Sequence, residues 1–503
     1  MVDPFSGHIW PMLPSLLTLG MILIVLTLLF NTVYNVYFHP LHGFPGPRIA
    51  AATSLYYIYW NARGERHKID LYLHMKYGEV VRVKPNQLSF VGDDAWKDIF
   101  MHRQGHPQMA KYGRGNSNTR GAHSLVSAPD DIHARQRKCL SHAFSEKALR
   151  EQEPLIKSYI DILISSMRED ALNGRPSDMV KYFNWISFDV VGDLAFAQSF
   201  DALRTRSTHP WIKAFFAGLK LRVILGEIIN FPILRPMIFL AMRIRALKGR
   251  KSSNFCRAAV KRRYELGDLN RPDFLGKVMQ KNAEKDRSAH MSEDEINMNF
   301  TVIMVAGSET TATLLSGCTF LLHKNPEVLK KLKAEVRSSF KSEDEINMIT
   351  VNKLPYLLAV IEEALRYYPP IAIALPRKSP PHGTTICGHH VPGNVVVGIP
   401  PWAANHSPNH FVHPDEFIPE RFLPNKEERF SQDRTAIHQP FSAGPRNCLG
   451  RNLANAEIRL ILARIIYNFD MELVDQKSEW MTNQKSYIIW SRPKLMVLSK
   501  ATT

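Results

Sequence analysis

The chain has 503 residues, 45% of them hydrophobic and 22% charged, and its formal net charge at pH 7 is +17. It is therefore long and apolar enough to fold around a large core. Its five cysteines are few and widely spaced, which excludes a disulfide framework and a zinc site and suits a reducing compartment. The positive charge fits a solvated surface, an anionic membrane leaflet or an acidic redox partner. No nucleic-acid partner is expected, because no recognition motif accompanies the charge.

The first predicted element is an apolar, uncharged helix over residues 13–30. At 1.5 Å per residue it reaches roughly 27 Å, enough for a thin bilayer such as that of the endoplasmic reticulum. A cleaved signal peptide is not expected, because residues 1–33 contain no Lys or Arg. The basic excess begins at Arg48, so the positive-inside rule predicts a lumenal N-terminus and a cytoplasmic body. A buried core helix is the alternative.

A break separates this helix from the rest of the chain. Residues 39–47 contain three prolines and two glycines, which cannot continue a helix. We therefore expect a membrane anchor at 1–38, a stiff proline-rich hinge at 39–48 and one folded body at 49–503.

The body opens with a predicted β-hairpin whose strands lie at 79–85 and 87–91. A polar, glycine-rich stretch at 101–130 follows, which we interpret as a long loop of the kind that often carries function. The next helix carries His133 and Arg137 four positions apart and hence on one face. Two such donors could hold a carboxylate; a solvated basic face is the alternative.

Residues 229–240 are unusually apolar for a turn region and are flanked by cations. One interpretation is a segment of the core. The other is a loop that dips into the membrane, which would let lipophilic substrates enter from the bilayer.

Ser292 and Glu295 form a predicted capping box that starts a long apolar helix. Within this helix the run 306–311, Ala-Gly-Ser-Glu-Thr-Thr, is unusual, because glycine and adjacent threonines are poor choices in mid-helix. Such a local violation is often functional, and the small residues leave space beside the helix. The heptapeptide at 292–298 recurs at 342–348; it is too short for a repeat unit and suggests no function.

The next long helix carries Glu363 and Arg366 three positions apart on one side, a pair that means little alone. After two prolines, residues 371–377 are predicted to be extended, with apolar side chains that would line a pocket. Further on, at the C-terminus, strands at 487–490 and 495–498 are predicted to form a closing hairpin.

The most informative stretch is 441–450, where Cys448 lies in a glycine-bounded loop directly before a helix sequence that starts at Arg451. Backbone N–H groups and the helix dipole at such a junction favour a thiolate. A thiolate held by N–H donors is what an axial haem ligand needs. Gly444 and Gly450 would let the backbone approach a flat macrocycle closely. The alternative is a buried structural cysteine.

Five positions of this stretch match the haem-binding signature of the cytochrome P450 family, Phe-x-x-Gly-x-Arg-x-Cys-x-Gly: Phe441, Gly444, Arg446, Cys448 and Gly450. The resemblance covers the whole chain and is closest to P450s of filamentous-fungal secondary metabolism. It implies a mainly α fold, the triangular helical P450 domain with a small β-rich side, after an N-terminal transmembrane helix. It also implies haem b as the cofactor, with Cys448 as the axial ligand of the iron.

The resemblance gives further residues a role. Five side chains are expected to bind the haem propionates: His133, Arg137, Arg377, His438 and Arg446. Glu309 and Thr310 match the acid–alcohol pair that delivers protons during oxygen activation. Glu363, Arg366 and Arg421 match the three charges of a buried structural network, with Arg421 in the family's Pro-x-Arg-Phe motif.

From the resemblance we expect a monooxygenase that inserts one oxygen atom of O2 into a lipophilic small molecule in fungal secondary-metabolite biosynthesis (terpenoid, polyketide or alkaloid). The chain has no Rossmann or flavin fingerprint, so its electrons must come from a partner, NADPH-cytochrome P450 reductase. The expected location is the endoplasmic reticulum membrane, crossed once, with a cytoplasmic catalytic domain that works as a monomer.

Two alternative functions remain open. One is a P450-fold enzyme that rearranges or dehydrates its substrate without reductive O2 activation, and the other is a non-catalytic haem sensor. The intact pair Glu309 and Thr310 favours the monooxygenase, because a sensor needs no proton relay.

Overall fold

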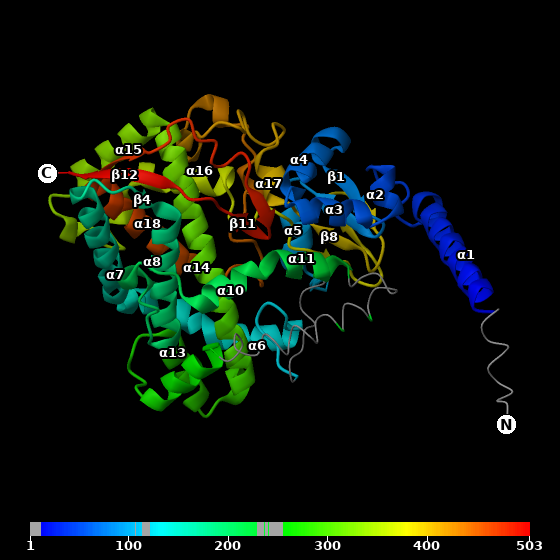
Figure 1. The fold of residues 1–503 in the computed structure, drawn as a ribbon, viewed down its shortest axis with the longest axis horizontal. Helices are drawn as coiled ribbons and strands as arrows, with labels where there is room; N and C mark the ends of the chain where they lie inside the picture. Colours follow the sequence, from blue (N-terminus) through cyan, green and yellow to red (C-terminus); the bar gives the residue numbers. More distant parts are fainter. Residues whose placement is uncertain are drawn as a thin grey trace, which may run out of the picture.

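The computed structural model describes residues 12–105, 107–112, 121–228 and 255–502, together with Pro236 and Leu240. Helix α1 (Met12–Val33) stands apart from the body of the molecule (Figure 1). Among the described residues, the one helix long and apolar enough to cross a membrane is Thr18–Phe38, with a mean hydropathy of 2.0 and no buried residues. The expected apolar N-terminal helix is confirmed, and since nothing covers it, it is not a core helix.

The hinge after α1 is packed against the first strand, β1 (Val80–Lys84). The Arg82 amide donates a hydrogen bond of 2.7 Å to the Pro45 carbonyl. A Cβ atom on Gly46 would lie 2.4 Å from the Arg82 carbonyl oxygen, so no side chain fits there. Leu41 is fully buried beside the sheet. The hinge is therefore held by packing as well as by its prolines.

Helices make up most of the body and gather on the side opposite α1 (Figure 1). Their bounds are α2 Arg48–Ala52, α3 Leu55–Arg63, α4 Arg66–Tyr77, α5 Ala95–Phe100, α6 Asp130–Ser141, α7 Glu146–Leu172, α8 Met179–Phe196, α9 Ala202–Thr205, α10 Pro210–Ala217, α11 Leu219–Ile228, α13 Phe274–Ala283, α14 Glu293–Lys324, α15 Pro326–Ser339, α16 Pro355–Tyr367, α17 Pro401–Asn405 and α18 Arg451–Asn468. Residues 255–266 are helical as well. The mainly α prediction is confirmed.

The strands form small sheets, the largest with the order β1-β2-β8-β5-β3. Besides β1, the strands are β2 Gln87–Phe90, β3 Ala110–Lys111, β4 Ser177–Asp178, β5 Arg377–Lys378, β6 Thr384–Ile386, β7 His389–Val391, β8 Val396–Gly398, β9 Phe469–Leu473, β10 Lys485–Tyr487, β11 Ile489–Ser491 and β12 Met496–Ala501. β1 and β2 form the predicted hairpin, and β8 pairs with β2 in parallel. The antiparallel pair β3–β5 sets Lys111 opposite Arg377.

The central helix α14 is the core of the body. It begins with the predicted capping box: the Glu295 amide donates to Ser292 Oγ at 3.3 Å, and the Ser292 amide donates to Glu295 Oε2 at 2.9 Å. Helices α8, α16 and α18 pack against it. Nearly every residue from Ser308 to Leu322 is buried, so this stretch packs against protein on all sides and carries little amphipathic pattern.

Three local expectations differ from the structure. The predicted loop 101–130 contains the short strand β3, and only the last residue of 371–377 is a strand residue. The predicted hairpin of 487–490 with 495–498 does not form, because residues 487–490 bend within the hairpin β10–β11 while β12 pairs with β9 and β4. The apolar segment 229–240 lies outside the described residues, apart from Pro236 and Leu240.

Candidate active site

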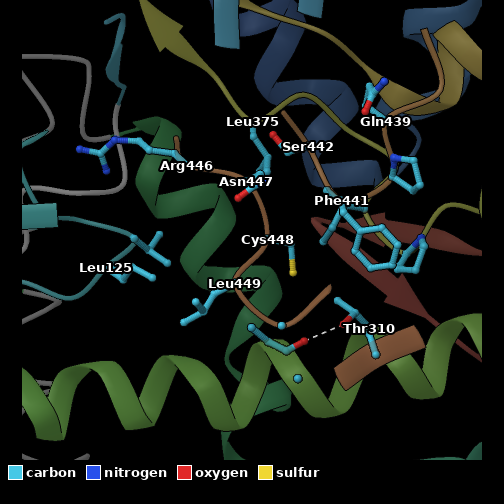
Figure 2. Close-up of a pocket in the computed structure, with 18 of the residues that line it drawn as sticks. Leu125, Thr310, Leu375, Gln439, Phe441, Ser442, Arg446, Asn447, Cys448 and Leu449 are labelled. Carbon is cyan, nitrogen blue, oxygen red and sulfur yellow. Dashed lines mark hydrogen bonds between the residues drawn. The ribbon is translucent and has the colours of Figure 1, made fainter. Parts of the chain in front are cut away.

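A cavity of about 450 Å³ lies between α14 and the loop that carries Cys448. On the α14 side, Val302, Ala306, Gly307 and Thr310 line it. Figure 2 shows the Cys448 sulfur pointing into this space from the opposite wall, with Thr310 on the α14 side. The small residues of the 306–311 run therefore leave open space in front of the sulfur, as the sequence predicts.

The cysteine loop, residues 441–450, has a backbone conformation that few residue types can adopt. Gly444 has φ +74°, and a Cβ atom there would lie 1.9 Å from the Phe100 carbonyl oxygen. Ser442 also has a positive φ, of 61°. The Cys448 amide donates to the Phe441 carbonyl at 2.9 Å, which closes the loop just before α18 begins at Arg451. The loop thus presents the sulfur at the N-terminus of a helix.

Cys448 lines the cavity and is exposed to its open space, unlike Cys139, Cys256 and Cys318, which are buried. Burial raises the pKa of Cys448, and the Gly450 amide together with Arg137 and Arg451 acts in the opposite direction. The expected help from backbone N–H groups is therefore present but smaller than the effect of burial. A metal cation at the sulfur would reverse this balance, because a coordinating thiol is deprotonated.

Four of the five residues expected to bind propionates line the cavity: His133, Arg137, Arg377 and Arg446. Arg137 donates to the backbone and side-chain oxygens of Asn447, at 2.6 and 2.7 Å. Arg446 pairs with Asp130 at 2.6 Å and donates to the Ala128 carbonyl at 2.7 Å. The structure therefore brings together residues that lie more than 300 positions apart in the chain.

The cations of this cluster are incompletely paired. Two nitrogens of Arg377 and one of Arg446 are buried without a hydrogen-bond partner among the described residues. The pKa of Arg377 is lowered to about 10 and that of His133 to about 4, in each case by burial first and then by the neighbouring Arg446. Buried guanidinium groups without an anion are costly. Residues in this state fit a cofactor that brings carboxylates to this edge of the cavity, as haem does.

The structure does not bring the fifth expected residue, His438, to the cavity. Its ring lies 5.7 Å from the Phe422 ring, and its Nε2 lies 3.6 Å from a Glu362 oxygen. Burial lowers its pKa to about 3, so the ring is neutral and forms no ion pair with Glu362. A further cation, Lys111, which belongs to no motif, lines the cavity opposite Arg377.

Thr310 and Glu309 are adjacent in the chain but face different surroundings. Thr310 lines the cavity, and its hydroxyl donates to the Ala306 carbonyl at 2.6 Å. Glu309 is buried and forms an ion pair with Arg492, which also donates to Asn184 Oδ1 at 3.1 Å. Burial raises the pKa of Glu309 against the opposing effect of Arg492. Only the alcohol of the predicted pair thus lines the cavity.

The three charges expected to form a structural network do so. Arg366 binds Glu363 at 2.7 Å and Arg421 binds it at 3.2 Å, with all three side chains fully buried. A fourth member is Asp433, which Arg421 binds at 2.6 Å. Asp433 could not be predicted from the sequence, because it belongs to no motif. Arg366 also donates to the carbonyls of Asn405, Pro414 and Glu416 and so ties α16 to the following segment.

Sequence reasoning also missed Glu457, an acid in the middle of α18. It is 1% exposed, lines the cavity, and its Oε1 has no hydrogen-bond partner among the described residues. Burial raises its pKa to about 8. The side chain is therefore largely protonated at neutral pH.

Comparison with known proteins gives one family over nearly the whole chain. The family model "Cytochrome P450" matches residues 45–499. Cytochrome P450 monooxygenase astA from Talaromyces wortmannii is 43% identical over 473 residues, covering 93% of this chain and 94% of that protein.

Two further relatives align over similar lengths. Cytochrome P450 monooxygenase tpeC from Talaromyces stipitatus is 41% identical, covering 95% of this chain and 94% of that protein. Versicolorin B desaturase stcL from Emericella nidulans is 40% identical, covering 96% and 97%. The relatives are fungal P450s of secondary metabolism, as the motifs predict.

Proposed function

This chain belongs to the cytochrome P450 family, and on that premise we propose that it inserts one oxygen atom of O2 into a lipophilic small molecule. The observation that carries this proposal is the position of Cys448, whose sulfur faces Thr310 across a cavity bordered by incompletely paired cations. A rearranging enzyme or a haem sensor would not need a hydroxyl at that place.

Haem b is the cofactor of this family. In this chain Cys448 would hold its iron, and Arg377, Arg446, His133 and Arg137 would lie around its carboxylates. When bound, the haem supplies the site at which dioxygen is activated. The protein contributes the thiolate, a cavity lined largely by apolar side chains, and groups that hold protons.

Thr310 is the residue that we expect to hold a proton or a water molecule at the reaction site. Its hydroxyl already donates to the Ala306 carbonyl, so a water molecule can in turn donate to its oxygen. Glu309 can supply protons only by leaving Arg492 or through a chain of water molecules, since it does not line the cavity. We therefore give Thr310 the direct role and Glu309 an indirect one.

The walls of the cavity support a lipophilic substrate. Apolar side chains on three segments line it, among them Leu125, Ile303 and Leu375. With relatives in fungal secondary metabolism, a terpenoid, a polyketide or an alkaloid is the proposed substrate class. One relative is named as a desaturase, so removal of two hydrogen atoms is the outcome to be separated from insertion of oxygen.

The proposed setting is the endoplasmic reticulum membrane, with residues 1–38 as a single anchor, 39–48 as the hinge and 49–503 as a cytoplasmic catalytic domain. The exposed apolar helix α1 and the net charge of +17 support this arrangement. NADPH-cytochrome P450 reductase is the proposed electron donor, and a monomer is the proposed working unit.

The test begins with deletion of the gene in its host and identification of the metabolite that accumulates. That metabolite is then given to the purified protein with reductase, NADPH and isotopically labelled dioxygen. We expect NADPH-dependent product that carries one labelled oxygen atom. Product formed without NADPH would support the rearranging enzyme instead, and an unlabelled product lacking two hydrogen atoms would indicate a desaturase.

A further inference from the structure

The segment 121–128, just before α6, carries Leu125, which lines the cavity and packs against the main core (Figure 2). The segment contains no helix, and its own hydrogen bonds form a turn. In this turn the amides of Ser127 and Ala128 donate to the Ser124 carbonyl at 2.9 and 2.8 Å. The Leu125 amide takes no part in these bonds. Its partner, and with it the position of this part of the wall, comes from other elements.

Asn299 of α14 holds the backbone of this segment. Its Oδ1 accepts a hydrogen bond of 2.7 Å from the Leu125 amide. Its Nδ2 donates to Gln136 Oε1 at 3.2 Å and to the Glu295 carbonyl at 2.8 Å. The side chain is 1% exposed, so water cannot replace these partners. Both ends of the amide group are bound, and it cannot turn without breaking bonds at each end.

Gln136 of α6 makes a second contact with the same segment. Its Nε2 donates to the His123 carbonyl at 2.7 Å and to Glu295 Oε1 at 3.2 Å. Gln136 is fully buried, like Asn299 beside it. Two side chains on different helices therefore hold the backbone at residues 123 and 125, one through a carbonyl and the other through an amide.

Glu295 fixes these two amide side chains in turn. It binds Arg135 of α6 at 2.5 and 3.1 Å, so that α14 and α6 are joined by an ion pair. Burial acts to raise the pKa of Glu295, but hydrogen bonds from Arg135, the Ser292 amide and Gln136 lower it below its usual value. The acid is therefore charged at neutral pH. The heptapeptide 292–298 thus contributes to the cavity wall through its fourth residue.

We propose that Asn299 is a positioning residue, which fixes Leu125 in the cavity wall and thereby determines which lipophilic substrates fit beside it. This inference rests on the proposed function, because it concerns the substrate of that reaction. Loss of the Asn299 side chain would leave the buried Leu125 amide without an acceptor, and the segment would have to move to satisfy it. Leu125 would move with its backbone, and the width of the cavity at this point would no longer be set.

The first measurement is hydrogen–deuterium exchange of the Leu125 amide in the holoenzyme. Asn299→Leu should accelerate this exchange by about 10-fold or more, because the amide loses its acceptor. Asn299→Asp keeps an oxygen at that place and should exchange as the wild type does. The matched control is Asn297→Leu, also on α14. Asn297 is 7% exposed, and its side chain has no hydrogen-bond partner among the residues that the structure describes, so its replacement should leave the exchange unchanged.

The second measurement separates a role in specificity from a purely structural one. Two probes that bind the iron through nitrogen, the flexible 1-octylimidazole and the rigid 4-phenylimidazole, are titrated while the shift of the Soret band is followed. The ratio of their dissociation constants should change by about 5-fold or more in Asn299→Leu and likewise in Leu125→Ala, because both alter the same apolar wall. It should stay unchanged in Asn297→Leu. The double variant should show the ratio of Leu125→Ala alone, because Asn299 acts through Leu125.

Three outcomes would overturn the proposal. Faster exchange in Asn299→Leu with an unchanged ratio would make the contact purely structural. Additive effects in the double variant would mean that residue 299 acts on the probes directly. An unchanged ratio in Leu125→Ala would remove Leu125 from the wall, and this result can be obtained even if Asn299→Leu folds poorly. The thiolate-type CO spectrum should persist in each variant that retains haem, so failure of this proposal leaves the proposed function standing.

Discussion

At the residue scale, burial and charge oppose each other around the cavity. The cations at its edge have lowered pKa values, and the acid Glu457 has a raised one. Each shift has the same first cause, the loss of water around a charged group. Burying these groups lowers the stability of the fold, and such destabilising groups are typically found where residues serve binding or catalysis.

Thr310→Ala tests the hydroxyl on α14. We expect haem content and substrate binding to be kept, while NADPH is still consumed and hydrogen peroxide replaces product. Proton delivery by a positioned group is typically worth roughly 10^2–10^4-fold. The measurement is the ratio of product formed to NADPH consumed, with Thr310→Ser, which keeps the hydroxyl, as the matched control. An unchanged ratio in the alanine variant would leave Thr310 with a packing role only.

Glu457→Gln tests the buried acid of α18. The pKa of Glu457 in the folded protein is about 8, above the usual value of 4.5, because burial favours the neutral carboxyl group. The free energy of unfolding is therefore highest below pH 4.5, where the carboxyl is neutral in both states, and this stability is lost as the pH rises through 8. Between about pH 5 and pH 8 the wild type should therefore lose up to about 4 kcal/mol of unfolding free energy relative to the variant. Urea unfolding at both pH values measures this, with the exposed Glu479→Gln as control. If the free energies of unfolding of the wild type and of Glu457→Gln differed by the same amount at both pH values, the raised pKa of Glu457 would be contradicted.

Site residues could be predicted most accurately from the sequence where the motif that contains them also determines the conformation of the local backbone. Cys448 and Arg446 lie in one short loop, and both line the cavity. Lys111 and His438 show where prediction from the sequence fails. The place of Lys111 depends on a strand pairing across 266 positions, and that of His438 on how the segment before Phe441 packs. Neither leaves a local pattern in the sequence.

At the element scale, the repeated heptapeptide shows how context decides structure. At 292–298 it caps and starts α14, with Glu295 paired to Arg135 at 2.5 Å. At 342–348 it forms only a short 3-10 turn, Glu343–Glu345. There the Thr350 hydroxyl donates to the Glu345 carbonyl at 2.7 Å, which competes with helical hydrogen bonds. An apolar helix sequence follows the first copy alone, so only that copy continues as an α-helix.

Gly444→Ala tests the cysteine loop as an element. Alanine at φ +74° would be strained by about 1–2 kcal/mol, and its Cβ would also collide with the Phe100 carbonyl. Gly105 is the matched control, since it has φ +75° but open space around it. We expect Gly105→Ala to keep normal haem content and Gly444→Ala to lose most of it, measured as bound haem per protein. Equal haem content in the two variants would mean that the close approach of the loop to α5 does not matter.

At the scale of the whole molecule, an exposed apolar helix is joined to a helical body through a packed hinge. The apolar N-terminal helix could be predicted from composition, and the mainly α class from the resemblance to the family. The order of the five-stranded sheet could not, because β2 and β8 pair across roughly 300 residues and no local signal specifies such a pair. The same holds for the partners that β12 takes in place of the predicted hairpin.

Removal of residues 1–38 tests the anchor. The truncated protein should move from the membrane fraction to the soluble fraction and keep its haem, because no residue of Thr18–Phe38 is buried and the helix α1 stands apart from the cavity. Protease treatment of sealed microsomes should digest the body of the full-length protein. Protection of the body would contradict the cytoplasmic orientation. Full retention of the truncated form on membranes would mean that the body itself carries the attachment, with residues 229–240 as the segment to examine.

We expect Cys448 to ligate the haem iron as a thiolate. The most direct measurement is the Soret band of the reduced, CO-bound protein. We predict the red-shifted band of thiolate ligation in the wild type and in Cys256→Ala, a variant at a buried cysteine that does not line the cavity, and its loss in Cys448→Ala. An active wild-type enzyme with only an imidazole-type CO spectrum would contradict it.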